Sequence, residues 1–429
     1  MEEDEALRDV WALRLYVFVW ARRFAPGVMA FFLSASSFLT MPFLWEDTGM
    51  PLLPTYIMTI VASLIGTILF AFWARLPAVA APFLGLNLWL VYGMVYAMGL
   101  SFQTTLLALL LASVWLWLFA SVPMLPRWLQ AVPSASLAGA RGGLGLWLIL
   151  HGLLVGKLLL PSPMNLTTVG NVSDPSAFVA LWGLLLVLAM RLQNSRLAVF
   201  WGTLGAILLA LFQGFIALPT KLDATPEGLD RVALQVIFGQ LGEALALSLA
   251  IFLVLFLDSQ ARLWALNRER SQNKRAFQAI ALTNAIGSLL GVGPLTVADA
   301  SFAARLAGNR KRWAAVAFIV LGWVFIYHEP IAKALLEFPA VIAPAFIVSG
   351  GALFFISLPA QKQFDAREQI SYLTTLLMTP LAANVIVGLA AGLSAYVLAS
   401  LASGKGKELS PVVYCLALLL MGVYIALKF

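Results

Sequence analysis

A few polar side chains stand inside long apolar stretches of this sequence, where they could bind a small solute. Asn87 lies between two leucines, Asp258 ends a run of apolar residues, and Asp299 follows a Gly-Pro pair. A polar group at membrane depth is costly, so it needs a reason to be there. A desolvated carboxylate can accept an N–H from a ligand and can carry a proton. Other polar residues of this kind are Gln235, Gln240, Glu243 and Asn384.

Each of these residues also has a purely structural interpretation. Asp258 stands four residues before Arg262, so the two could form a simple ion pair along one helix at the cytoplasmic rim. Asp299 could be a local turn former, and Glu243 a solvated helix cap. His151 fits a helix-packing role. Asn87 has no partner close in sequence.

Two interrupted apolar segments must position these side chains. Leu76–Asn87 contains Pro77 and Pro82, which cannot both lie inside a regular helix. Gly291–Asp299 contains a second Gly-Pro break. Broken segments at membrane depth are tolerated only inside protein or beside a cavity, and one in each half of a chain indicates a transporter's central site. We therefore expect the two breaks to face each other and the substrate to lie between them. The expected substrate contacts are Gly85, Asn87, Asp258, Gly293, Thr296 and Asp299, with Asp258 and Asp299 also coupling transport to protons.

The composition is that of a membrane protein. Of 429 residues, 62% are hydrophobic and 11% charged, against about 25% charged in soluble domains. The net charge of +7 is attributed to basic cytoplasmic loops, not to nucleic-acid binding. With one cysteine and two histidines, no disulfide, metal site or cofactor is expected.

Fourteen apolar runs are candidate membrane spans, and the third and tenth are the interrupted ones. Residues 1–24 begin with an acidic stretch and are expected to lie at the membrane interface. The spans lie near 25–45, 54–74, 77–99, 103–123, 137–160, 175–191, 197–218, 234–260, 277–291, 294–308, 313–329, 336–358, 371–401 and 411–428.

Charged loops orient these spans. Loops rich in Lys and Arg alternate with acidic or mixed loops. This pattern predicts that both termini lie on the cytoplasmic side of the membrane, which we expect to be a bacterial plasma membrane. The breaks occupy the third position of each seven-span half. Because seven is odd, the second half would be inverted relative to the first.

Short motifs, spread in order over most of the chain, resemble the azaguanine-type hypoxanthine/guanine permeases of the nucleobase–ascorbate transporter superfamily. The motifs are Phe38-Leu39-Thr40-Met41, Gly49-Met50-Pro51, Ala81-Pro82 with Gly85-Leu86-Asn87, Phe256-Leu257-Asp258, Ala285-Ile286-Gly287-Ser288 with Leu290-Gly291, Ala343-Pro344-Ala345, Met378-Thr379-Pro380-Leu381 and Pro411-Val412-Val413-Tyr414.

The resemblance implies an all-α multi-pass fold of fourteen helices in two inverted seven-helix repeats, usually a homodimer. A core domain (25–127 and 231–332) would hold the substrate against a gate domain (128–230 and 333–429). The family's purine-binding positions carry over as Gly85, Asn87 and Asp258. The implied activity is secondary transport of a purine nucleobase together with protons.

The sequence departs from the family at two positions, which keeps a second function open. Ala261 stands where the family has a second aspartate, and Ala300 where it has a binding glutamate, with Asp299 one residue earlier. The alternative is a transporter of the same fold for sulfate, bicarbonate or a dicarboxylate, with Arg262 assisting at the half-helix N-termini. An enzyme would need a cluster of acid, base, metal or nucleophile groups, and the sequence has none. A scaffold would not need two matched breaks.

Overall fold

The structure is a computed structural model of the chain. It describes residues 23–31, 34, 37–38, 41–42, 44–46, 48–82, 86–87, 89–122, 131–162, 166–193, 195, 198–216, 241–266, 273–298, 300–301, 311–327, 338–361, 364–382 and 384–426. Apart from Arg23 and Phe24, the predicted interfacial segment 1–24 lies outside these residues, as do Gln235 and Gln240.

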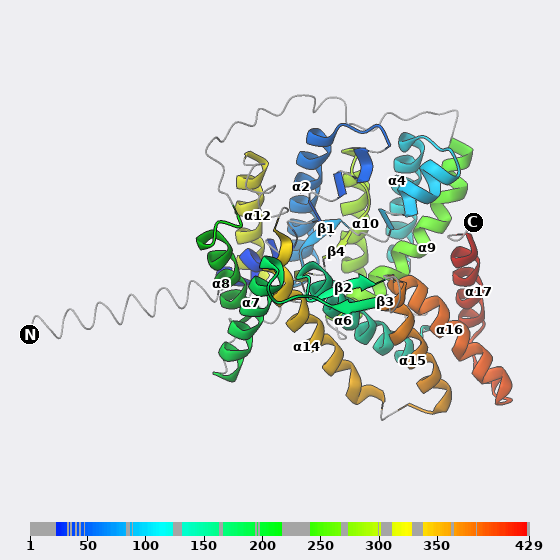
Figure 1. Cartoon of the computed structure of the whole chain (residues 1–429). Coiled ribbons are helices and arrows are strands. Elements are labelled where there is room, and N and C mark those ends of the chain that lie inside the picture. The colour runs from blue at the N-terminus through cyan, green and yellow to red at the C-terminus, as the bar shows by residue number, and fades with distance from the viewer. Residues whose placement is uncertain are drawn as a thin grey trace, which may run out of the picture.

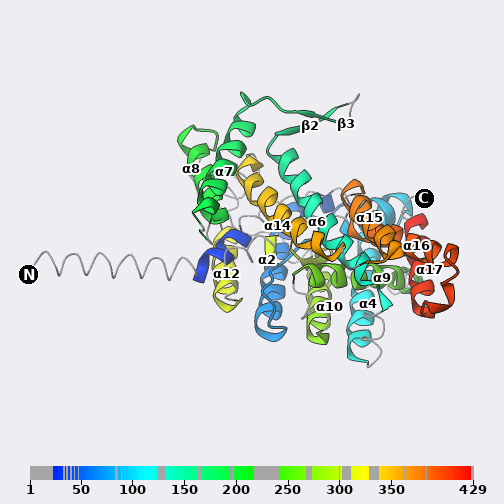
Figure 2. The ribbon, with the colours of Figure 1, turned by 90° about the horizontal axis from the view of Figure 1, so that it is seen from below.

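The helices form two groups that lie on opposite sides of the molecule (Figure 2). In the first group α4 packs against α9 and α10, and α2 packs against α10 and α12. The members are α2 (Leu52–Ile68), α4 (Phe102–Ser121), α9 (Leu241–Leu266), α10 (Lys274–Leu289) and α12 (Lys311–Tyr327). Helix α2 continues into a π-helical turn, η1 (Leu69–Trp73).

In the second group α6 packs against α14 and α15, α7 against α8, and α16 against α15 and α17 (Figure 1). Its members are α6 (Ser134–Val155), α7 (Pro175–Leu192), α8 (Ala198–Phe212), η6 (Pro339–Ile342), α14 (Ala343–Gln361), α15 (Ala366–Leu381), α16 (Val385–Ala402), η7 (Gly406–Glu408) and α17 (Pro411–Ala426). Contacts between α6 and α9 join the two groups.

Glycines on α6 let its neighbours approach closely. A Cβ added at Gly145 would lie 2.6 Å from the carbonyl oxygen of Gly350 on α14, and one at Gly139 would lie 2.6 Å from that of Tyr372 on α15. Small residues serve this purpose in membrane helices, where lipid is as apolar as a leucine side chain and close packing drives association.

Six helices of the described part are long and apolar enough to span a membrane.

The two interrupted segments lie against each other, as the sequence predicted. Strand β1 (Ala80–Pro82) pairs antiparallel with β4 (Leu295–Val297), and the register places Ala81 opposite Thr296. Arg75, with φ of 55°, turns the chain ahead of β1. After β1 the chain continues into the π-helical segment η2 (Trp89–Ala97).

The structure corrects two details of the predicted fold. Beyond α6 the chain forms an antiparallel pair, β2 (Leu159–Ser162) with β3 (Leu166–Val169), so the fold is mostly rather than entirely helical. Gly156 ends α6, and Pro161 could not extend a helix. The predicted single span 371–401 is wrong, because α15 and α16 are separate helices that pack together. One helix of that length would measure about 46 Å, longer than a bilayer core.

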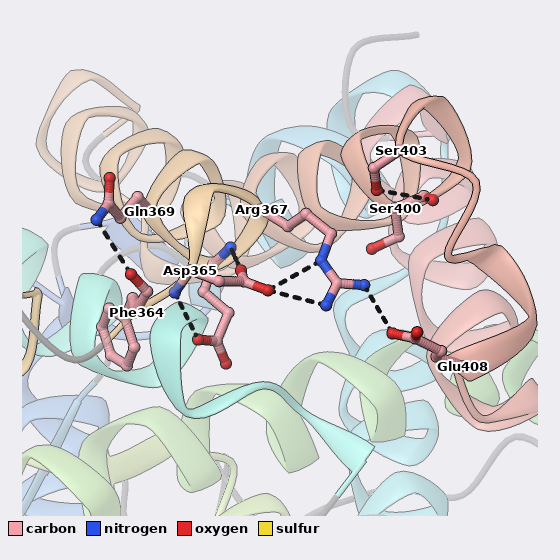
Figure 3. A network of polar contacts seen from close by, with 8 residues as sticks. Phe364, Asp365, Arg367, Gln369, Ser400, Ser403 and Glu408 are labelled. Carbon is pink, nitrogen blue, oxygen red and sulfur yellow. Dashed lines mark hydrogen bonds and ion pairs between the residues drawn. The ribbon is translucent and has the colours of Figure 1, made fainter.

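A polar network ties the start of α15 to the loop before α17 (Figure 3). Asp365 caps α15 by accepting from the Glu368 backbone N–H at 2.9 Å. Arg367 bonds Asp365 at 2.8 Å and Glu408 at 3.2 Å. The Glu368 bond and, after it, the Arg367 guanidinium hold the pKa of Asp365 below its usual value.

Candidate functional site

A buried ion pair on α9 touches the second break. Arg262 Nε donates to Asp258 Oδ1 at 2.8 Å, and the two side chains are 5% and 1% exposed. The Thr296 hydroxyl on β4 donates to Asp258 Oδ2 at 2.9 Å, and Arg262 Nη1 donates to the Val297 carbonyl at 3.3 Å. The i,i+4 pair that the sequence allowed therefore forms, and both of its side chains are buried.

Asn87 links the first break to the second. Its side chain is 1% exposed, accepts from Trp45 Nε1 at 2.7 Å and donates to the Pro294 carbonyl at 3.1 Å. A Cβ at Gly293 would collide with Asn87 Oδ1 and with the Trp45 indole. Glycine is therefore required at residue 293 so that the backbone can approach these two side chains.

Side chains from neighbouring helices satisfy the backbone of both breaks. Asn284 on α10 accepts from the Leu295 N–H at 2.8 Å and donates to the Leu295 carbonyl at 2.7 Å. The hydroxyls of Thr67 and Ser301 accept from the N–H groups of Ala80 and Val79, each at 3.0 Å. Irregular backbone without water needs such partners.

The structure brings together four of the six predicted contact residues: Asn87, Asp258, Gly293 and Thr296. Gly85 and Asp299 lie outside the described residues. Sequence reasoning missed Trp45 and Asn284. For Asn284, a buried amide in an apolar helix was the available signal; nothing local to Trp45 marked it.

Other candidates lie away from the breaks. His151 packs against the rings of Trp147 and Phe346, at 5.6 and 5.2 Å between centroids, which agrees with a packing role. Glu243 is exposed at the start of α9. In the described part of the chain, no three His, Cys, Asp or Glu side chains are placed to hold a metal.

The paired breaks bring several kinds of polar group together. The arrangement gathers an amide, a hydroxyl, a carboxylate and a guanidinium beside the paired strands β1 and β4. The charges of Asp258 and Arg262 oppose each other within this ion pair.

Known transporters resemble the chain over nearly its whole length. It is 26% identical to the guanine/hypoxanthine permease PbuO of Bacillus subtilis (strain 168), over 92% of this chain and 94% of that protein. It is 25% identical to the adenine permease AdeP of Escherichia coli (strain K12), over 90% and 89%. No family model matches the sequence.

The fold also matches a solved transporter. The structure of the murine Solute Carrier 26 family member A9 anion transporter aligns with a TM-score of 0.54 at 11% identity, covering 89% of this chain and 68% of that one. That likeness concerns the fold alone. Together with the ordered motifs, the relatives PbuO and AdeP show that the chain is similar over about nine tenths of its length to guanine/hypoxanthine and adenine permeases.

Proposed function

We propose that this protein is a secondary transporter that moves a purine nucleobase, of the hypoxanthine, guanine or adenine kind, across a bacterial plasma membrane. One observation carries the proposal: β1 and β4 pair directly, and the buried Asn87, Asp258 and Thr296 gather at that pair. The names of the relatives PbuO and AdeP support a purine as the solute.

The chemistry of these side chains fits a flat heterocycle. A purine presents ring N–H groups, ring nitrogens and an exocyclic oxygen or amine in one plane. The Asp258 carboxylate and the Asn87 amide offer acceptors and a donor at fixed positions. Gly85 and Gly293 would give the ring access to the backbone, and Asp299 would add a second carboxylate.

The charge of the site favours a neutral base over an anion. An anion site needs uncompensated positive charge, whereas the Arg262 guanidinium contacts Asp258 at 2.8 Å. The alternative of sulfate, bicarbonate or dicarboxylate transport therefore takes second place.

Transport would proceed by rigid-body motion of a core domain (25–127 and 231–332) against a gate domain (128–230 and 333–429). The packing of α2, α4, α9, α10 and α12 as one group supports the first unit. The homodimer, the fourteen inverted spans, the cytoplasmic termini and proton coupling through Asp258 and Asp299 stay predictions from the sequence.

Uptake of radiolabelled hypoxanthine, guanine and adenine by proteoliposomes tests the proposal. We expect Asn87→Ala to abolish uptake, and Thr296→Val, which removes only the hydroxyl bonded to Asp258, to reduce it at least tenfold. Asn171→Ala, at an exposed loop, is the control and should transport normally. Normal purine uptake by Asn87→Ala in folded protein would remove Asn87 from the site.

A further inference from the structure

Arg141 on α6 contacts the last described turn of α9, across the boundary between the two helix groups. Its guanidinium donates to the Trp264 carbonyl and lies 4.3 Å from the centre of the Trp264 ring. Arg141 is the only Lys, Arg, Asp or Glu residue in the sequence of α6, a helix that is long and apolar enough to span a membrane. A charged side chain in such a helix is costly and is usually kept for a function.

Helices α6 and α9 are held by different neighbours. Gly143, two positions after Arg141, lets α6 lie directly on α15, because a Cβ added there would lie 2.6 Å from Thr379 Cβ. Helix α9 packs on α4 instead, and its Asp258 accepts from the Thr296 hydroxyl on β4. Arg141 therefore reaches from a helix of the second group to the helix that carries Asp258.

We propose that Arg141 is a latch of the transport cycle: its contact with Trp264 holds one end state and must break before the other end state forms. This inference rests on the proposed function, in which the group that contains α9 moves as a rigid body against the group that contains α6. It names a residue that controls the rate of this motion.

The short reach of both parts of the contact suits them to this task. A hydrogen bond is lost once its donor and acceptor are more than about 3.5 Å apart, and a cation–π contact once the cation is more than about 6 Å from the ring centre. One helical turn is about 5.4 Å long, so a displacement of α9 along α6 by more than a turn would remove both parts.

The contact is also separated from Asp258 along the helix. Trp264 follows Asp258 by six residues, which is about 9 Å along the axis of α9. Loss of the latch should therefore change the rate of transport and leave the affinity for the substrate unchanged.

Crosslinking tests whether the contact breaks during transport. Cys415→Ser removes the native cysteine, and Arg141→Cys is then combined with Trp264→Cys in the full-length protein. A short bis-methanethiosulfonate reagent joins the two thiols, and dithiothreitol releases them. We expect uptake of radiolabelled hypoxanthine by proteoliposomes to stop after crosslinking and to return on reduction. Full uptake by the crosslinked protein, or failure of the folded protein to crosslink, would overturn the inference.

A crosslink within the second helix group is the matched control. The hydroxyl oxygens of Ser136 on α6 and Ser371 on α15 lie 2.8 Å apart, so the same reagent can join Ser136→Cys to Ser371→Cys. This crosslink should leave uptake unchanged, because α6 and α15 move together. Equal loss of uptake with both pairs would overturn the assignment of the latch to the boundary. If the wild type takes up no purine, the proposed function fails, and both pairs are compared with sulfate and bicarbonate instead, so that the two proposals are judged separately.

Removal of the guanidinium tests the latch without a crosslink. Arg141→Met keeps a long side chain without a donor or a charge, so this end state loses its extra bond. The rate of uptake should rise about threefold or more, while the dissociation constant of hypoxanthine stays that of the wild type. Lys157→Met removes an exposed cation just beyond the end of α6 and is the control, which should match the wild type in both measurements. An unchanged or slower rate in folded Arg141→Met would contradict the inference.

Discussion

Asn284 offers a sharp test of how the second break is held in place. Its amide accepts from the Leu295 N–H and donates to the Leu295 carbonyl, and the side chain is fully buried. Asn284→Ala leaves both backbone groups of Leu295 without these bonds. An unsatisfied buried polar group costs about 1–3 kcal/mol, so the two together should lower the free energy of unfolding by about 2–6 kcal/mol.

The matched control for Asn284→Ala lies one turn away on the same helix. Ser288→Ala removes a hydroxyl that donates to the Asn284 carbonyl of its own helix, whose loss should cost at most about 1 kcal/mol. Thermal unfolding in detergent measures the stability of both variants, and equilibrium binding of radiolabelled hypoxanthine measures the site. We expect Asn284→Ala to melt well below Ser288→Ala and to bind weakly. Equal melting and equal binding would refute the role of Asn284 in holding β4.

Three further substitutions probe the breaks, the packing and the charged loop. Gly293→Ala should abolish purine binding, because its methyl group collides with Asn87 and Trp45; binding at wild-type affinity would contradict that contact. Gly145→Leu should destabilise the protein by more than about 2 kcal/mol by separating α6 from α14, whereas Gly351→Leu, where a Cβ has nothing within 4 Å, should melt as wild type. Asp365→Asn should lower the melting temperature at pH 7. Because folding depresses the pKa of Asp365, its contribution is full above the unfolded value of about 3.9 and disappears as pH falls through the folded value. A difference from wild type that grows on acidification would contradict the assignment.

The sequence predicted the breaks well because their cause is local. Pro77 and Pro82 exclude a continuous helix whatever surrounds them, and Gly293-Pro294 does the same in the second half. The i,i+4 spacing of Asp258 and Arg262 likewise made their contact one of the interpretations open from the sequence. Their burial could not be predicted, since it depends on α4, α10 and β4 packing around them.

Long-range partners were out of reach of a single sequence. Trp45 and Asn87 are 42 positions apart, and Val79 and Ser301 are 222 apart, so no local pattern announces either hydrogen bond. The run 371–401 was wrongly predicted to be one span because it stays apolar on both sides of Pro380 and Asn384. The chain turns there between α15 and α16. Hydropathy measures how apolar a segment is and does not locate a turn within it.

The central claim is that the paired breaks bind a purine, and a thermal-shift screen of the purified protein tests it most directly. A ligand that binds only the folded state at a hundred times its dissociation constant stabilises it by about 2.7 kcal/mol. We predict a rise in melting temperature with hypoxanthine, guanine, adenine or xanthine that is lost in Asn87→Ala. A rise only with sulfate, bicarbonate or a carboxylate would contradict the account and point to an anion transporter of the same fold.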